Sequence, residues 1–184
     1  MPPSSKPAPR IPSIPDSALG PPQLVNALRQ RRGGSLLNLD RMLLHSPAYA
    51  EGWNAFMGAV RSGLSLDARL RELAICTVAV LNRADYEWQQ HAPLLLAAGA
   101  SQAQLDGLRD VDTALHNSAT FDPAERAVIE LCMQMCRQVQ VSDACFARVQ
   151  AALGTVQQQV ELVGIIAAYN MVSRFLEALQ VAQE

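Results

Sequence analysis

The hydrophobic residues of this chain follow a helical repeat almost without interruption from Pro22 onward. Apolar positions recur three and four residues apart, and no segment shows the sustained alternation of apolar and polar residues that is typical of a strand. Proline, glycine and N-capping residues divide the repeat into segments, as at Gly33-Gly34, Ser46-Pro47 and Asp122-Pro123. The sequence therefore predicts an all-α fold built from helical hairpins.

The division points also predict where each helix begins and ends. We expect helices at residues 22–31, 36–44, 47–62, 67–82, 85–98, 101–109, 122–139, 142–153 and 155–181. The length of 184 residues suits one domain with a substantial core, which we place at residues 22–184.

A proline-rich arm is expected at residues 1–21, which hold seven of the eleven prolines. Such a composition does not pack a core and favours an extended segment. The arm is either a disordered tail or a strap across a neighbouring subunit, and the apolar Ile11 and Ile14 give weak support to the second interpretation.

Charge and hydropathy limit the partners of the chain. The net charge of −2 and the pI of about 5.9 give no attraction to nucleic acid or to an anionic membrane. Charged residues make up 17% of the chain, against about 25% in typical globular domains. We therefore expect a homo-oligomer that buries part of its surface against copies of itself, the alternative being a monomer with a Gln- and Ser-rich surface.

The expected location is the cytoplasm. Prolines occupy the N-terminus where the apolar part of a secretory signal would lie. The longest apolar run, near residues 160–172, is interrupted by Glu161 and Asn170 and is too short to span a bilayer, so no membrane partner is expected.

The cysteines and histidines do not predict a metal site or a disulfide framework. The four cysteines lie in apolar helical contexts without a C-x-x-C pair, and the cytoplasm would keep them reduced. The three histidines are scattered, so metal-ligand spacing is missing and no metal or other cofactor is expected. The cysteines are Cys76, Cys132, Cys136 and Cys145.

Glu72, Glu87 and His91 are the candidate catalytic residues. Glu72 shares a helix face with Ile75 and Cys76, where a carboxylate is costly unless it is paired or protonated. Glu87 and His91 are four residues apart and face the same way, and a carboxylate beside an imidazole orients the ring and favours its charged form. The alternatives are an outward-facing Glu72, a Glu87 that only stabilises the first turn of its helix, and a core histidine.

The segment Arg71–His91 reads RELAICTVAVLNRADYEWQQH. Eleven residues separate Glu72 from Ala84. Two more separate Ala84 from Glu87, and three separate Glu87 from His91. This spacing resembles the alkylhydroperoxidase-D motif Glu-x11-Cys-x2-Cys-x3-His with both cysteines replaced. The segment is therefore similar to the carboxymuconolactone decarboxylase superfamily, in the branch that carries Tyr-Glu-Trp-x-x-His. The motif favours an inward-facing Glu72.

The resemblance extends from about Arg10 to the C-terminus and is strongest over residues 69–99. It implies an all-helical fold of the alkylhydroperoxidase-D-like type that assembles as a trimer or hexamer. Hydroperoxidase members use a cysteine pair relayed through the Glu and the His, whereas Ala84 and Glu87 stand at those cysteine positions here. Decarboxylase members act on a carboxylated muconolactone with acid–base residues and no cofactor, and they are typically shorter than this chain.

Residues upstream of the motif also resemble this branch, in GGSLLNLDRMLLHSP at residues 33–47. Asn38, Arg41 and His45 fall on one helix face, and Arg41 could hold a carboxylate substrate because a guanidinium matches that geometry. Asn38 and Arg41 are therefore candidate substrate-binding residues. The alternative is a surface arginine beside Asp40 with His45 as a cap.

Four further aromatic, polar or charged positions complete the candidate set. Tyr86 precedes Glu87 and is a candidate substrate-binding residue at the edge of the pocket, since a tyrosine can donate a proton or a hydrogen bond. The segment at residues 167–179 resembles the closing helix of the family, and Tyr169, Asn170 and Arg174 are expected to support the site or an interface.

Three functions remain open from the sequence. The first is a cofactor-free acid–base enzyme on a small lactone or carboxylic acid, with His91 as general acid or base, Glu72 as its partner and Glu87 as its orienter. The second is an alkylhydroperoxidase- or peroxiredoxin-like oxidoreductase that uses Cys76, although a lone cysteine in an apolar helix lacks the electropositive setting of a thiolate. The third is a non-catalytic oligomeric binding protein.

Overall fold

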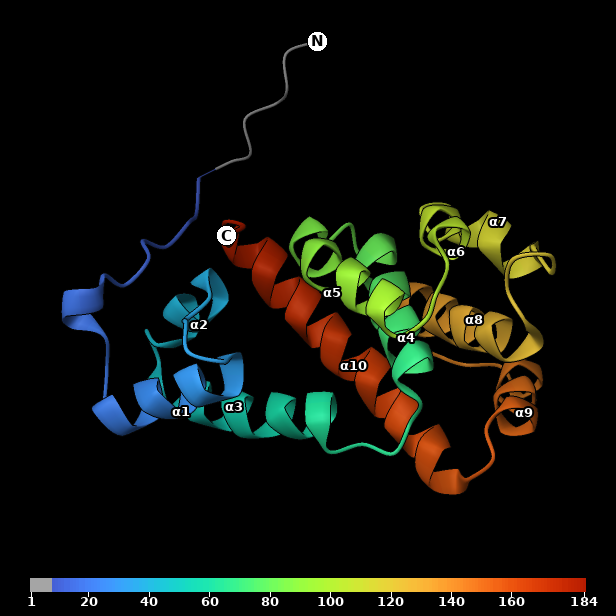
Figure 1. The fold of residues 1–184 in the computed structure, drawn as a ribbon, viewed down its shortest axis with the longest axis horizontal. Helices are drawn as coiled ribbons and strands as arrows, with labels where there is room; N and C mark the ends of the chain where they lie inside the picture. The colour runs from blue at the N-terminus through green and yellow to red at the C-terminus, as the bar shows by residue number, and fades with distance from the viewer. Residues whose placement is uncertain (1–7) are drawn as a thin grey trace, which may run out of the picture. The chain divides into compact units, whose positions relative to one another are not determined.

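The computed structural model describes residues 8–184, and every regular element in that range is helical (Figure 1). The all-α prediction is confirmed for this part of the chain. The helices are α1 (Pro22–Arg32), α2 (Asn38–Leu43), α3 (Pro47–Ser62), α4 (Ala68–Leu81), α5 (Asp85–Ala97), α6 (Gln102–Gly107), α7 (Val111–His116), α8 (Pro123–Arg137), α9 (Asp143–Ala152) and α10 (Val156–Leu179), preceded by a short 3₁₀ turn at Asp16–Ala18.

Each predicted helix is present with ends that differ by at most a few residues, but the sequence prediction missed α7. This helix is only six residues long, too short to display a helical repeat. Its signal is local: the Asp110 carboxylate accepts hydrogen bonds from the backbone N–H and the hydroxyl of Thr113, at 3.0 and 2.8 Å. An Asp-x-x-Thr pair of this kind is an N-cap that needs no long apolar face to its helix.

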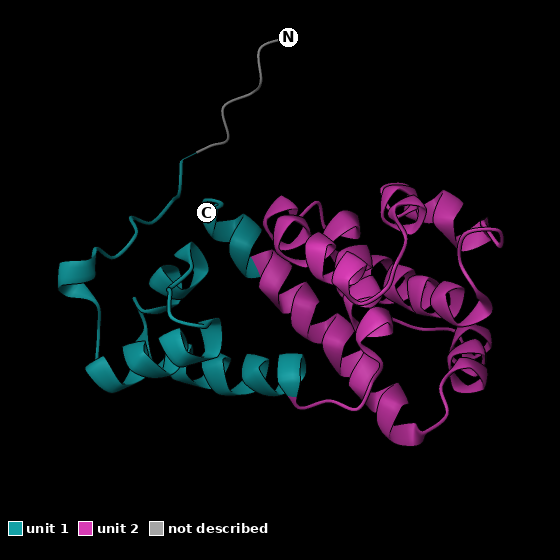
Figure 2. Cartoon of the chain, viewed as in Figure 1, with its two compact units in different colours: residues 1–62, 175–184 teal, residues 63–174 magenta. Residues whose placement is uncertain are grey.

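The helices form two compact units (Figure 2). Unit 1 contains the described residues up to Ser62 together with residues 175–184, and unit 2 contains residues 63–174. Helix α10 lies in unit 2 as far as Arg174 and in unit 1 from Phe175 onward. The predicted division into an arm at 1–21 and one domain at 22–184 stays a prediction, and residues 1–7 of the arm lie outside the described residues.

Unit 1 is organised around a buried carboxylate. Asp40 on α2 has no exposed surface, and it contacts Arg31 at 3.3 Å and Arg32 at 2.9 Å. Its second role is to accept the backbone N–H of Leu37 at 3.0 Å, which caps α2. Two cations and a backbone donor offset the cost of burying the charge.

The described part of the arm is held by its own chain. The backbone N–H of Arg10 donates to the carbonyl of Leu179 at 3.0 Å, and the carbonyl of Pro12 lies 2.8 Å from His45 Nε2. Ile11 and Ile14 are both half-buried. These contacts give residues 10–14 a fixed place within unit 1.

Unit 2 is built around α4. Every residue from Glu72 to Ala79 is buried, because α5 packs on one side of α4 and α8 on another. Helix α8 begins with Asp122 as N-cap and Pro123 at the first helical position, and the Glu125 carboxylate accepts a hydrogen bond from the Asp122 N–H at 2.8 Å. This reciprocal cap fixes the start of α8 where it packs on α4.

Helix α10 has the composition of a core helix. By length and mean hydropathy its 24 residues could cross a membrane, but half of the most apolar window is buried inside the fold. Its buried face also carries polar side chains at Tyr169 and Ser173. A helix that is half-buried and places polar groups in the interior is best explained as part of the core.

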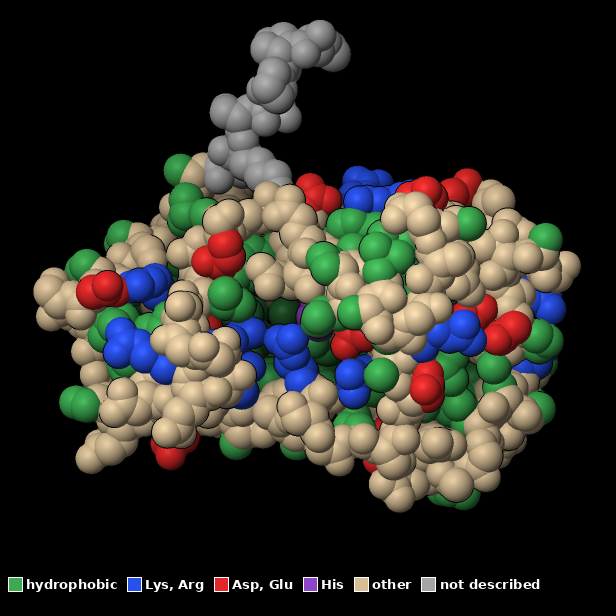
Figure 3. Space-filling model, in the orientation of Figure 1, with side chains coloured by type: hydrophobic (Ala, Val, Ile, Leu, Met, Phe, Trp, Pro, Cys, Tyr) green, Lys and Arg blue, Asp and Glu red, His purple; other side chains and the backbone are tan. Residues whose placement is uncertain are grey.

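Apolar side chains also reach the surface, where Figure 3 shows them between charged and polar ones. In unit 2, the most exposed are Val139, Val156 and Val160, which retain 81%, 73% and 66% of their surface. Exposed valines and a low charge fraction are what a self-associating surface requires. The homo-oligomer itself, trimer or hexamer, stays a prediction.

Candidate active site

A buried chain of three hydrogen-bonding side chains lies in unit 2. His91 Nδ1 on α5 is 2.7 Å from Glu72 Oε2 on α4, and His91 Nε2 is 3.2 Å from the Tyr169 hydroxyl on α10. The imidazole and phenol rings meet edge to face, with centroids 5.0 Å apart. The three residues retain 6%, 4% and 2% of their surface, in the order Glu72, His91, Tyr169.

The α4–α5 connection brings Glu72 and His91 together. Helix α4 ends at Leu81, and a short turn with Arg83 in the left-handed region, at φ 56°, leads into α5. The Ala84 N–H closes this turn by donating to the Ala79 carbonyl at 2.8 Å. Two helices joined by so short a loop must pack antiparallel, so a residue near the start of α4 meets one well inside α5.

Glu72 is a carboxylate in this arrangement. Burial alone would raise its pKa, but the hydrogen bond and charge of His91, and then Arg71 at 3.3 Å, lower the pKa below its ordinary value. A carboxylate can only accept, so the proton between Glu72 and His91 is assigned to Nδ1. When the ring is neutral, Nε2 carries no proton and accepts a hydrogen bond from the Tyr169 hydroxyl; when the ring is charged, Nε2–H donates to that hydroxyl.

The lowered pKa of Glu72 predicts acid sensitivity. A group whose folded pKa lies below its unfolded value stabilises the fold above the unfolded value, and this stabilisation is lost as the pH falls through the folded pKa. The urea concentration at the unfolding midpoint of the wild type should therefore decrease as the pH is lowered below about 4.5, the ordinary pKa of Glu72. Glu72→Gln should show a smaller decrease over the same range. Parallel pH profiles for the two proteins would contradict this expectation.

Glu87 is held by the same segment of α10 that carries Tyr169. The Ser173 hydroxyl donates to Glu87 Oε2 and lies 2.8 Å from the Tyr169 carbonyl. Glu87 is in the first turn of α5 and retains 2% of its surface. Tyr86, beside it, is also buried rather than at an exposed edge. The catalytic role of Glu87 and the substrate-binding role of Tyr86 stay predictions.

The structure gives Tyr169 a more central place than the sequence did. The sequence predicted only a supporting or interface role, whereas the hydroxyl contacts His91 directly. The available signal was the pair Tyr169 and Ser173, four residues apart on a helix whose other buried side chains are apolar. A polar pair on a buried face indicates partners in the interior.

The three candidates upstream of the motif lie in unit 1, where each forms a hydrogen bond with a backbone carbonyl near one end of the chain. They are Asn38, Arg41 and His45. The Asn38 amide donates to the carbonyls of Ala182 and Gln183, both at 3.2 Å. Arg41 donates to the Ile14 carbonyl at 2.9 Å. These bonds give Asn38 and Arg41 structural roles, and their substrate-binding roles stay predictions.

The cysteines lie in settings that favour the thiol. Burial raises the pKa of Cys76 far above its ordinary range, and the negative charges of Glu72 and Glu87 raise it further, while Arg109 lowers it. Burial also raises the pKa of Cys132, and it raises that of Cys145 to about 11. Among residues 8–184, no group of three or more His, Cys, Asp and Glu side chains is arranged to hold a metal ion.

Comparison with known proteins relates the segment around Glu72 and His91 to one family. The sequence model of the carboxymuconolactone decarboxylase family matches residues 47–131, a range that contains Glu72 and His91. No curated protein sequence matches the chain.

Several solved structures share the fold. One is the alkylhydroperoxidase AhpD core of an uncharacterized peroxidase-related protein from Ralstonia eutropha JMP134, with a TM-score of 0.78 at 18% identity over 98% of this chain and 94% of the other. An uncharacterized peroxidase-related protein from Silicibacter sp. TM1040 has a TM-score of 0.76 at 14% identity, over 98% of this chain and 96% of the other. A variant of the debrominase Bmp8, in complex with 2,3,4-tribromopyrrole, has a TM-score of 0.72 at 15% identity, over 94% of this chain and 90% of the other.

At these identities the solved structures show a shared fold and no more, while the family match covers Glu72 and His91 but not Tyr169. Residues 47–131 therefore match the carboxymuconolactone decarboxylase family, and the chain shares its fold with alkylhydroperoxidase D-like and peroxidase-related proteins.

Proposed function

We propose that this protein is a cofactor-free acid–base enzyme acting on a small lactone or carboxylic acid. The observation that carries the proposal is the hydrogen-bonded chain Glu72–His91–Tyr169, which joins a carboxylate, an imidazole and a phenol in the interior. Both ring nitrogens of His91 are engaged, and we assign the transfer of a proton to the substrate to the Tyr169 hydroxyl, which shares a hydrogen bond with His91 Nε2. The proposal changes the role that the sequence suggested for His91: it exchanges a proton with the Tyr169 hydroxyl instead of with the substrate.

The chain can complete a decarboxylation. Cleavage of the bond between the carboxylate carbon and the substrate releases CO2 and leaves the electron pair on the substrate as a dienolate. The Tyr169 hydroxyl then protonates the carbanionic carbon and becomes a phenolate. His91 Nε2 takes up one proton from solvent and passes it to the phenolate, and Glu72 stabilises the imidazolium during this step, so the net reaction consumes one proton and restores the starting chain.

The peroxidase alternative lacks an activated thiol. Ala84 and Glu87 stand at the two positions of the family's redox pair. The four cysteines of the chain lie at other positions. Cys76 is fully buried on α4 beside Glu72, where negative charge opposes formation of the thiolate that peroxide chemistry needs.

Thiol labelling checks this point without any substrate. At pH 8, an aromatic disulfide reagent should react slowly with the native protein, and Cys136 should react first because it alone among the cysteines is half-buried. In guanidinium, where the protein is unfolded, all four thiols should react rapidly with the reagent. Rapid labelling of one thiol in the native protein, lost in Cys76→Ser, would contradict the prediction and favour peroxidase chemistry.

The direct test of the proposed function is a panel of small carboxylated lactones labelled with ¹³C in the carboxyl group. We expect the wild type to release labelled CO2 from at least one of them. Turnover should persist after treatment with a chelator and after alkylation of accessible thiols. Dependence on an added metal ion or on a free thiol would overturn the cofactor-free mechanism. No turnover of any compound would favour the non-catalytic binding protein.

A further inference from the structure

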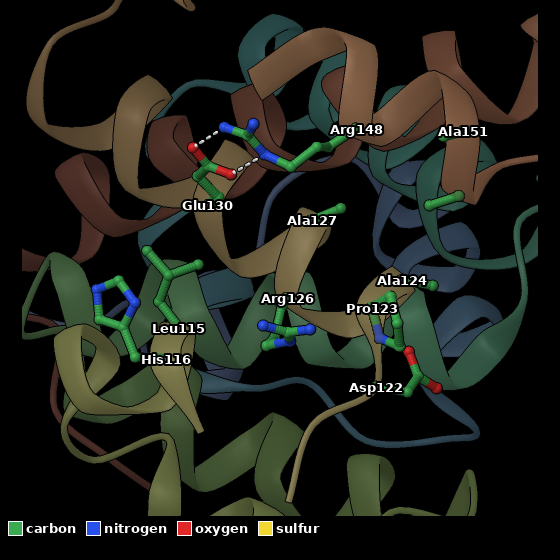
Figure 4. Close-up of a pocket in the computed structure, with 11 residues that line it drawn as sticks. Leu115, His116, Asp122, Pro123, Ala124, Arg126, Ala127, Glu130, Arg148 and Ala151 are labelled. Atoms are coloured by element: carbon green, nitrogen blue, oxygen red, sulfur yellow. Dashed lines mark hydrogen bonds and ion pairs between the residues drawn. The ribbon is translucent and has the colours of Figure 1, made fainter. Parts of the chain in front are cut away.

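A cavity in unit 2 lies outside the candidate active site. It is bounded by α7, the first half of α8 and α9, and its volume is about 840 Å³ (Figure 4). None of its lining residues belongs to the Glu72–His91–Tyr169 chain. Its apolar lining consists mainly of small side chains, which leave space for a ligand: Leu115, Ala124, Ala127, Ala151 and Ala152. The volume falls in the range of about 300–1,000 Å³ that ligand pockets occupy.

Most of the charge around this cavity is already compensated. Arg148 donates to Glu130 through Nε at 2.7 Å and Nη2 at 2.5 Å, and Figure 4 shows these two bonds as dashed lines. The Asp122 carboxylate accepts the Glu125 N–H at 2.9 Å and lies 3.3 Å from Arg69. The two carboxylates that line the cavity are therefore committed to other groups.

Arg126 is the exception. Within residues 8–184 its guanidinium has no hydrogen bond or ion pair, and its Nε is buried without an acceptor. Figure 4 shows the guanidinium among the lining residues with no bond drawn to any of them. A half-buried cation without an acceptor is unfavourable, and each such group in a native structure calls for an explanation. An anion in the cavity would supply that explanation.

We propose that this cavity binds a small organic monocarboxylate with an apolar body. A guanidinium matches a carboxylate geometrically and can donate two parallel hydrogen bonds to it. The alanine and leucine side chains provide apolar contacts for the rest of the molecule, and His116 lines the same cavity as a further hydrogen-bonding group. Because Asp122 and Glu130 already take up the charges of Arg69 and Arg148, Arg126 leaves one positive charge for a ligand, and a dianion such as phosphate would keep one charge uncompensated.

Benzoate is a suitable probe, with benzamide as its neutral counterpart. In protein labelled with ¹³C at alanine methyls, benzoate should shift the signals of Ala124, Ala127, Ala151 and Ala152 in a saturable manner. Benzamide and inorganic phosphate should bind at least tenfold more weakly. Saturable shifts confined to alanines beside Glu72 and His91, or equal binding of benzamide or phosphate, would overturn the assignment.

Two variants separate the cavity from general charge effects. Arg126→Met keeps most of the apolar stem and removes the cation, so it should weaken benzoate binding at least tenfold without lowering the melting temperature. Arg137→Met removes the same charge from the same helix outside the cavity, where Arg137 pairs with Asp112, and it should leave benzoate binding unchanged. Equal loss in both variants, or full binding by Arg126→Met, would overturn the proposal.

Discussion

Replacing His91 with alanine should lower kcat/KM on a lactone substrate by about 10²- to 10⁴-fold, the usual contribution of a positioned acid–base group. The physical reason is that His91 links both other members of the chain, at 2.7 Å to Glu72 and 3.2 Å to Tyr169. Without the imidazole, Tyr169 loses the group that exchanges its proton. Steady-state kinetics on the compound identified by the lactone panel measures the effect.

A matched control separates chemistry from folding. His45→Ala removes a histidine of unit 1 whose contact is with the Pro12 carbonyl, and it should leave kcat/KM within about twofold of the wild type. His91→Ala will also cost stability, by roughly 1–3 kcal/mol, because Glu72 loses its partner while buried. Urea unfolding of both variants shows whether the loss of turnover exceeds what partial unfolding explains. Unchanged kcat/KM in a folded His91→Ala protein would contradict the role of His91.

The largest stability effect is expected at Asp40. Asp40→Ala should lower the free energy of unfolding by about 3–5 kcal/mol, as when one partner is removed from a buried ion pair. Arg31 and Arg32, whose side chains retain only 15% and 10% of their surface, would lose their shared carboxylate. The cap of α2 at Leu37 would be lost as well.

Asp16→Ala is the matched control for Asp40→Ala. Asp16 pairs with Arg41, but its side chain is 75% exposed, so the pair is screened by solvent. The free energy of unfolding should change by less than about 1 kcal/mol. Urea titration followed by circular dichroism compares the two variants, and an equal effect at both positions would show that burial of Asp40 does not matter.

The fold was largely predictable because its helices are long and clearly periodic. Helices α3, α4 and α8 have apolar faces and capping residues that define their ends, so their positions follow from local sequence. The short α7 depends on one Asp–Thr cap and has no comparable signal. The division of the helices into two compact units depends on tertiary packing, which periodicity does not specify.

The candidate site was predictable only where its residues are close in sequence. Glu72 and His91 lie nineteen positions apart on two helices joined by a short turn, so their meeting follows from hairpin geometry. Tyr169 is 78 positions from His91. Helical periodicity shows that α10 buries a face, but the residue of that face that meets His91 is decided by packing over the whole unit.

The most direct test of the acid–base chain is Tyr169→Phe, with Tyr49→Phe as the control. The substitution removes one hydroxyl from a buried ring and preserves its shape, whereas Tyr49 is an exposed tyrosine of unit 1. On the active lactone, Tyr169→Phe should lower kcat by at least about 10²-fold, because the terminal proton donor is lost. Its urea midpoint should stay close to that of the wild type. Tyr49→Phe should retain full activity. Wild-type kcat in Tyr169→Phe would contradict the account.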